Sequence, residues 1–284
     1  MAKLNEYLGN TDLMFDEMDQ QFLRKYEQYL RDKKSNGINT IHSNLKIFRK
    51  VFNDAVREEL IEPHLNPFLK YRLVTAKSKK EYLTDEEIKK IEELELVEGS
   101  VMFHHRNIYI FATYAGGIRI SDILQLRWQN FDGTHINLTT QKTKEAVHIK
   151  LPTKALQILE LYNGYQPEKK NTDFIFPFLK NDIEYTPALL FRAISSNTAY
   201  ANKNLKEITK KAKVEKKISF HSSRHTFATR ALIKGMRIEY VSKIMSHASI
   251  KTTQVYTKIV NEELDIAMDI FNEQTLPDNE PTKD

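Results

Sequence analysis

The stretch HSSRHTFATR, residues 221–230, sets His221 and His225 four positions apart with Arg224 between them. On a helix this spacing places both imidazoles on one face, as in the histidine pair of zinc hydrolases. Such an enzyme needs a glutamate directly after the first histidine, where this chain has Ser222, and an arginine beside the second would repel a cation. The pattern therefore argues against a metal site and leaves two interpretations, a phosphate-binding site or a core helix with polar side chains.

The residues that follow favour the phosphate interpretation. His247 and Tyr256 both lie in the stretch MSHASIKTTQVYT, residues 245–257. Arginine and histidine side chains donate hydrogen bonds to a phosphoryl group as it gains charge in a transition state. Tyr256 is one of 13 tyrosines, and by itself it would be assigned to packing. In combination with these donors, its hydroxyl becomes a candidate nucleophile.

The composition is that of a globular protein with enough apolar residues for a core. The chain has 284 residues, of which 40% are hydrophobic. No uninterrupted apolar run approaches the length of a membrane span, and the N-terminus MAKLNEYLGN lacks the apolar centre of a secretory signal, so we expect a cytoplasmic protein. The absence of cysteine excludes disulfides, thiolate metal sites and cysteine nucleophiles. A net charge of +5 permits a polyanionic partner.

An amphipathic helix is predicted in NTIHSNLKIFRKVFNDAVREEL, residues 39–60. Its apolar stripe consists of Ile41, Leu45, Phe48, Phe52, Ala55 and Val56. The opposite face carries basic and amide side chains that suit phosphates and base edges, although an ordinary solvated face is the alternative. The candidate DNA-binding residues on this face are His42, Lys46, Arg49, Lys50, Asn53 and Arg57. A second basic run, residues 200–217, contains seven lysines and two glutamates.

The helical pattern is interrupted between two segments of the chain. It breaks at Pro63 and Pro67 and resumes at Thr84, which forms a predicted capping box with Glu87. We therefore expect two domains joined by a linker.

One part of the second domain is predicted to be a β-hairpin. The stretches THINLTT (134–140) and AVHIKLP (146–152) are rich in β-branched residues and are separated by QKTKE. The turn presents Lys142 and Lys144, and most of the remaining segment is predicted to be helical.

Three stretches together resemble the tyrosine recombinase (phage integrase) family: YAGGIRISDILQLRW at 114–128, HSSRHTFAT at 221–229 and MSHASIKTTQVYT at 245–257. The resemblance implies an α+β fold that is mainly α with a small antiparallel β-sheet. It implies that residues 1–75 form a helical, SAM-like core-binding domain, which binds DNA. A linker at 76–82 and a catalytic domain at 83–260 would follow. Residues 261–284 are then a C-terminal helix and tail. In this family such a helix packs into a neighbouring protomer, and packing onto its own domain is the alternative.

The resemblance implies a catalytic set of seven residues: Arg119, Asp122, Lys142, His221, Arg224, His247 and Tyr256. In the family, the matching arginines, here Arg119 and Arg224, clamp the non-bridging oxygens of the scissile phosphate. Tyr256 matches the nucleophile and His221 the base that assists it. His247 matches a further donor to the phosphate.

Two members of this set leave alternatives. The hairpin lysine that protonates the leaving group matches Lys142, with Lys144 as the other candidate. Asp122 matches the acidic residue that supports Arg119, and direct proton transfer is its alternative role.

Other residues near these motifs are assigned structural roles. His225 is interpreted as helical support for its neighbours, and the histidines at 104–105 are expected at the surface. Ser246 stands where the family commonly has glycine, so the turn before His247 is expected to differ locally.

The activity that the resemblance implies is site-specific DNA recombination or integration for a mobile element. Double-stranded DNA would be cut and rejoined through a 3′-phosphotyrosyl intermediate without a metal or other cofactor. The expected working form is a homotetramer on two paired DNA sites in the bacterial nucleoid, with no membrane as partner. Accessory DNA-bending proteins are candidate further partners. The target sequence and a further N-terminal arm-binding domain are left open. A type IB topoisomerase-like activity and a DNA-binding accessory protein without catalysis are the alternatives.

Overall fold

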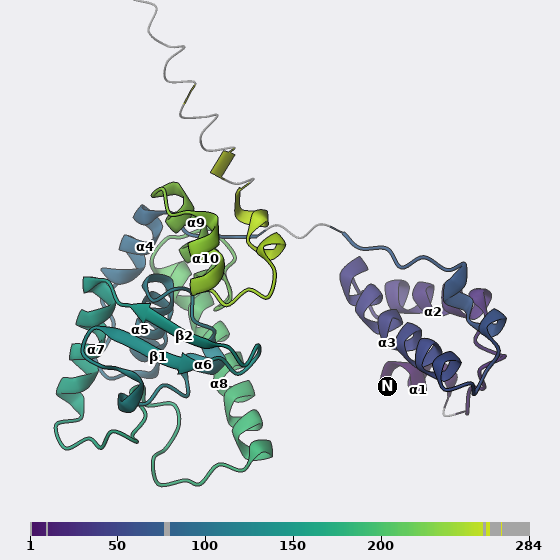
Figure 1. The fold of residues 1–284 in the computed structure, drawn as a ribbon, viewed down its shortest axis with the longest axis horizontal. Helices are drawn as coiled ribbons and strands as arrows, with labels where there is room; N and C mark the ends of the chain where they lie inside the picture. The colour runs from purple at the N-terminus through teal and green to yellow at the C-terminus, as the bar shows by residue number, and fades with distance from the viewer. Residues whose placement is uncertain (1, 10, 77–79, 258–259, 262–267, 269–284) are drawn as a thin grey trace, which may run out of the picture. The chain divides into compact units, whose positions relative to one another are not determined.

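The chain folds into two compact units, Met1–Lys79 and Lys80–Asp284 (Figure 1). Each unit has its own hydrophobic core. The structure is a computed structural model that describes residues 2–9, 11–76, 80–257, 260–261 and 268. Part of the expected linker, residues 77–79, and nearly all of the expected C-terminal helix and tail at 261–284 lie outside the described residues.

The first unit is helical, as the sequence predicts. Its elements are α1 (Ala2–Leu8), α2 (Gln20–Asp32), α3 (Ile38–Arg57) and the 3₁₀ turns η1 (Pro63–Leu65) and η2 (Pro67–Leu69).

The core of the first unit lies between α2 and α3. Leu23 and Leu30 of α2 are fully buried and share a cluster with Ile41 and Leu45 of the predicted apolar stripe. Burying one such side chain stabilises the fold by about 1.5–3 kcal/mol. Because the stripe faces the core, the basic face of α3 is left toward solvent.

The second unit is organised around one buried helix, α5 (Val101–Tyr114), as Figure 1 shows. The helices α4 (Asp85–Glu92), α7 (Thr153–Tyr165), α8 (Pro187–Lys211) and α9 (Ser222–Ile233) all pack against it. A helix contacted on so many sides needs apolar residues around most of its circumference, and α5 has them.

The predicted hairpin is present. Strands β1 (His135–Thr139) and β2 (Ala146–Lys150) pair antiparallel, with Leu138 opposite Val147. Ile136 and Ile149 point into the core of the second unit. Because one face of the hairpin is anchored there, its turn at 141–145 occupies a defined position.

A glycine turn connects α5 to the short helix α6 (Ile120–Ile123). Gly117 has φ +65°, in the left-handed region that glycine adopts most easily. A Cβ at this position would lie 3.0 Å from the Cα of Arg224 and 3.1 Å from its Cγ. The absence of a side chain at Gly117 therefore lets α9 approach the turn closely.

The remaining elements complete the second unit. They are η3 (Trp128–Asn130), α10 (Ile238–Ile244) and η4 (Ile250–Thr252). None of the described helices combines the length and the apolar character that crossing a bilayer requires.

The expectation that the histidines at 104–105 lie at the surface is wrong. His105 is 0% exposed, and its Nδ1 lies 2.8 Å from Asn204 Nδ2. Its ring stacks on Phe178, while His104 is half-buried with its Nδ1 hydrogen-bonded to the Tyr162 hydroxyl at 2.8 Å. Both side chains lie on α5, whose central position buries even its polar residues.

Candidate active site

Hydrogen bonds to the side chains of α9 hold this helix inside the second unit. The Tyr109 and Ser222 hydroxyls are 2.8 Å apart, and the Leu83 backbone N–H donates to Thr226 Oγ1 at 3.0 Å. These bonds link α9 to α5 and to the segment that precedes α4. They satisfy the polar side chains of α9, so a helix without a clear apolar face can be buried.

Arg224 is a buried cation held by neutral groups. Its side chain is 5% exposed, and its guanidinium donates Nη1–H to Gly117 O at 2.8 Å and Nη2–H to Met245 O. Burial, with a contribution from Arg119, lowers the pKa of Arg224 to about 10, so it stays protonated at neutral pH. Asp122 lies near enough for its charge to act on Arg224, but no carboxylate of the described residues forms an ion pair with it, and a buried cation without a directly paired anion favours an incoming one.

Arg119 and Asp122 lie at the start of α6, close to Arg224. The charge of Arg119 lowers the pKa of Arg224 and also acts on Asp122. Asp122 is 6% exposed, and its Oδ1 accepts a 2.9 Å hydrogen bond from the Gln141 N–H. Burial raises the pKa of this carboxyl, and its Oδ2 has no hydrogen-bond partner among the described residues. The hydrogen bond of Asp122 thus goes to the hairpin turn and not to Arg119.

The two hairpin lysines act on different neighbours. Both side chains are exposed, and Lys144 has φ +57°. The charge of Lys142 contributes to lowering the pKa of His221, whereas the charge of Lys144 acts on Asp122. Lys142 is therefore the hairpin lysine whose charge reaches the histidine at the start of α9.

His221 and His247 stand around the same group of cations. His221 is exposed, but partial desolvation and the charges of Arg224 and other cations lower its pKa. The Nδ1 of His247 lies 2.8 Å from Thr253 Oγ1, and burial together with Arg224 lowers its pKa to about 4. Both imidazoles are therefore mainly neutral at neutral pH. No set of three or more His, Asp or Glu side chains in the described part of the chain could hold a metal ion.

The turn before His247 has an unusual backbone. Ser246 has φ +50° and is 3% exposed. This left-handed conformation favours glycine, the residue common here in the family that the sequence resembles.

Tyr256 lies against α9 and α10. Its side chain is 4% exposed and belongs to a cluster with Val241 and Met245. Burial raises the pKa of the phenol, while the charge of Arg224 acts in the opposite direction. Its hydroxyl lies 2.7 Å from His225 Nδ1.

The sequence interpretation missed the contact that His225 makes. This residue was assigned to helical support, yet its side chain hydrogen-bonds the candidate nucleophile. The four-residue spacing from His221 was a signal in the sequence, and the two rings indeed meet edge to face at 4.7 Å between centroids. The seven candidate catalytic residues all belong to the second unit.

The candidate DNA-binding residues lie on α3, in the first unit. Lys46, Arg49 and Lys50 are exposed, as are Asn53 and Arg57, and His42 is half-buried. Some of this positive charge is offset, because Asp54 pairs with Lys50 at 2.6 Å and also with Arg57. The basic face of α3 thus includes Arg49 and Lys46, neither of which has a salt bridge among the described residues.

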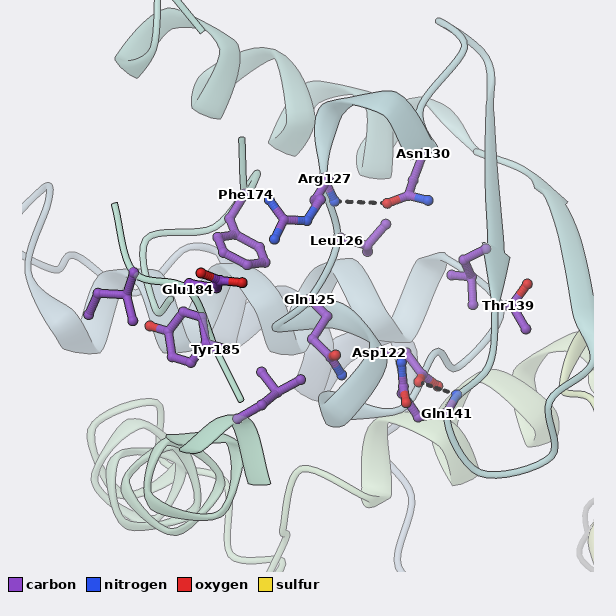
Figure 2. A pocket seen from close by; sticks show the side chains of 13 residues that line it. Asp122, Gln125, Leu126, Arg127, Asn130, Thr139, Gln141, Phe174, Glu184 and Tyr185 are labelled. Carbon is purple, nitrogen blue, oxygen red and sulfur yellow. Dashed lines mark hydrogen bonds between the residues drawn. The ribbon is translucent and has the colours of Figure 1, made fainter. Parts of the chain in front are cut away.

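A pocket of about 400 Å³ adjoins the site without containing it (Figure 2). Figure 2 shows the hydrogen bond between Asp122 and Gln141 on one side, and Arg127 beside Phe174 on the other. Of the candidate catalytic residues only Asp122 lines this pocket. The cations around Arg224 lie outside it.

Two family models match the chain. The model described as "Phage integrase family" matches residues 81–263, and the one described as "Phage integrase SAM-like domain" matches residues 1–73.

Individual relatives and solved structures agree with these matches. Tyrosine recombinase XerC of Pelotomaculum thermopropionicum is 26% identical over 264 residues, which cover 90% of this chain and 83% of that protein. The crystal structure of XerH site-specific recombinase bound to palindromic difH substrate has a TM-score of 0.69 at 19% identity, covering 95% of this chain and 77% of that one. The Tn1549 transposon integrase in complex with transposon right end DNA has a TM-score of 0.64 at 17% identity, covering 90% and 86%.

Proposed function

The chain belongs to the phage integrase family and is thus a tyrosine-type site-specific DNA recombinase, and we propose that it serves a mobile element with Tyr256 as its nucleophile. Recombinases of this family cut and rejoin DNA through a 3′-phosphotyrosyl intermediate. In the proposed reaction the Tyr256 hydroxyl oxygen attacks the scissile phosphorus and the 5′-oxygen leaves. One phosphodiester is exchanged for another, so its bond energy is kept for rejoining.

The observation that carries this proposal is the state of Arg224. It is buried and charged, its guanidinium hydrogen-bonds only carbonyl oxygens among the described residues, and it lies close enough to Tyr256 for its charge to oppose the rise in the pKa of the phenol that burial causes. A phosphate entering beside Tyr256 would supply the missing negative charge. Fixed cations at this position stabilise the charge that develops on the non-bridging oxygens.

Other residues of the set complete the proposed chemistry. Arg119 is the second arginine of the clamp, and His221 and His247 donate to the phosphate oxygens. The leaving 5′-oxygen is strongly basic and needs a proton, which Lys142 supplies from the hairpin turn. Asp122 holds that turn against α6 through its bond to Gln141.

The first unit is proposed to bind duplex DNA. The exposed basic side chains of α3 and, in the second unit, the lysine run at 200–217 would each contact phosphates of the duplex. Such contacts release counterions, so binding should weaken steeply as salt rises. Residues 1–75 would be the core-binding domain and residues 83–260 the catalytic domain, with 76–82 as the linker.

The proposed working form is a homotetramer on two paired DNA sites, with residues 261–284 exchanged between protomers and accessory DNA-bending proteins as further partners. The proposed location is the cytoplasm, on the bacterial nucleoid. The proposal that this recombinase serves a mobile element is supported by its resemblance in fold to a transposon integrase.

Trapping on nicked DNA tests the proposal. The site would first be selected from a random-sequence duplex pool by full-length Tyr256→Phe protein, and then offered with a nick near the cleavage position in the presence of EDTA. We expect wild type to form a covalent complex that survives a denaturing gel, and Tyr256→Phe to bind but form none. Binding by both proteins with no covalent complex from either would point to a DNA-binding accessory protein.

A further inference from the structure

His225 contacts the atom that is proposed to react. Its Nδ1 lies 2.7 Å from the Tyr256 hydroxyl oxygen, and the two side chains are 8% and 4% exposed. Such a distance between buried groups is that of a good hydrogen bond, shielded from competing water.

The protonation states and the available partners together set the direction of this hydrogen bond. Burial and the charges of His221, Lys80, Arg224 and His247 lower the pKa of His225 to about 4. The imidazole is therefore neutral at neutral pH and has one acceptor nitrogen. Burial raises the pKa of Tyr256, so the phenol keeps its proton. Among the described residues the buried Tyr256 hydroxyl has no other hydrogen-bond partner, so its proton is donated to Nδ1 and the ring proton of His225 is on Nε2.

The geometry separates the roles of the two histidines on α9. Within the described residues, the Tyr256 hydroxyl hydrogen-bonds His225 and makes no such bond to His221. His221 instead sits at the exposed start of α9, where the charges of Arg119, Arg224 and Lys142 all act on it. That position suits a donor to the phosphate better than a base for the phenol.

We propose that His225 is the catalytic base that takes the Tyr256 hydroxyl proton on its Nδ1 during DNA cleavage and returns it during rejoining. The inference rests on the proposed function of Tyr256. As the proton moves to Nδ1, the Tyr256 oxygen bonds to phosphorus and the bond from phosphorus to the 5′-oxygen breaks. The 5′-oxygen takes a proton from Lys142.

DNA itself would prepare His225 for this role. Its imidazole is held neutral partly by Arg224 and the neighbouring cations. A phosphodiester bound among these cations offsets their charge, so His225 becomes more basic when the substrate is in place. The free enzyme keeps its nucleophile protonated until then.

Two substitutions and two substrates test the inference in the full chain. His225→Asn keeps an acceptor near the position of Nδ1 but cannot take up a proton near neutral pH, whereas Lys142→Ala removes the proposed acid. Each variant is assayed on the selected nicked duplex with either oxygen or sulfur as the bridging 5′ atom. A thiol ionises near about pH 8.5, far more readily than an alcohol, so the sulfur substrate does not need the acid.

We expect His225→Asn to slow covalent complex formation by about 10²–10⁴-fold on both substrates. Sulfur should restore the rate of Lys142→Ala but not that of His225→Asn. The wild-type rate should fall at low pH as the catalytic base becomes protonated. This fall should be absent in His225→Asn. A wild-type rate in this variant, or its rescue by sulfur, would overturn the inference while leaving Tyr256 as nucleophile.

A measurement without DNA checks the contact itself. The ¹⁵N spectrum of the His225 side chain should show an unprotonated Nδ1 that shifts in Tyr256→Phe, with thermal unfolding of each variant as the folding control. A protonated Nδ1, or a spectrum unchanged in Tyr256→Phe, would refute the hydrogen bond donated by Tyr256 to His225 and with it the role of His225 as base. If wild type forms no Tyr256-dependent complex, the proposed function fails and the inference fails with it.

Discussion

Replacing Gly117 with alanine should damage both the stability of the second unit and the position of Arg224. The left-handed backbone at φ +65° costs an alanine about 1–2 kcal/mol. The new Cβ would also lie 3.0 Å from the Cα of Arg224, which is backbone and cannot rotate away. Overpacking of this kind adds about 1–3 kcal/mol, so we expect a loss of about 2–5 kcal/mol.

Gly235 offers a matched control. It has φ +83°, and a Cβ there would meet nothing within 4 Å. Gly235→Ala should therefore carry the backbone cost of about 1–2 kcal/mol without the steric one. At about 2–4 °C per kcal/mol, the melting temperature of the second unit should fall by about 4–20 °C in Gly117→Ala and by about 2–8 °C in the control.

Calorimetry of the full chain measures this difference, with the two units allowed separate transitions. Gly117→Ala should also form covalent complex more slowly than Gly235→Ala, because Gly117 O accepts a hydrogen bond from Arg224. Equal melting temperatures and equal rates in the two variants would refute the argument that the close approach of α9 requires glycine.

Three further predictions concern pH, the hairpin and DNA. Burial lowers the pKa of His105 to about 4, so between pH 6.5 and 5 the unfolded chain binds a proton at this histidine and the folded chain does not. The free energy of unfolding should therefore fall by up to about 2 kcal/mol as the pH is lowered from 6.5 to 5. Urea titrations at each pH should show a shallower fall in His105→Gln. Lys142→Ala should slow trapping on ordinary nicked DNA by about 10²–10⁴-fold and Lys144→Ala far less, and the opposite order would exchange their roles. Arg49→Ala should lower the slope of log affinity against log salt by about 1 in gel shifts at several salt concentrations, and an unchanged slope would remove it from the DNA interface.

Periodicity was a reliable guide where the structure is local. The stripe from Ile41 to Phe52 predicted the buried face of α3, and the capping box of Thr84 and Glu87 forms at the start of α4 as predicted. The hairpin followed from two β-rich stretches and a short polar turn. In each case the pattern itself lies within one helix, one helix start or two adjacent stretches of the chain, so the local backbone geometry of these elements makes it visible in the sequence.

The histidines show where such prediction stops. His105 has a polar neighbour in sequence and no apolar pattern that marks it as core, and it is buried because α5 is covered on many sides. His221 and His225 were correctly placed on one helix face, but the partner of His225 is 31 residues away in sequence.

The sequence by itself determined the family, the helical first unit, the hairpin and the candidate set around Arg224 and Tyr256, because these depend on residue identity and short-range spacing. Only the tertiary structure decided which lysine acts on His221, why Gly117 must lack a side chain, and which histidine hydrogen-bonds Tyr256. Those facts depend on angles and distances between elements far apart in the chain. They are fixed by close packing of the whole second unit, which no local pattern encodes.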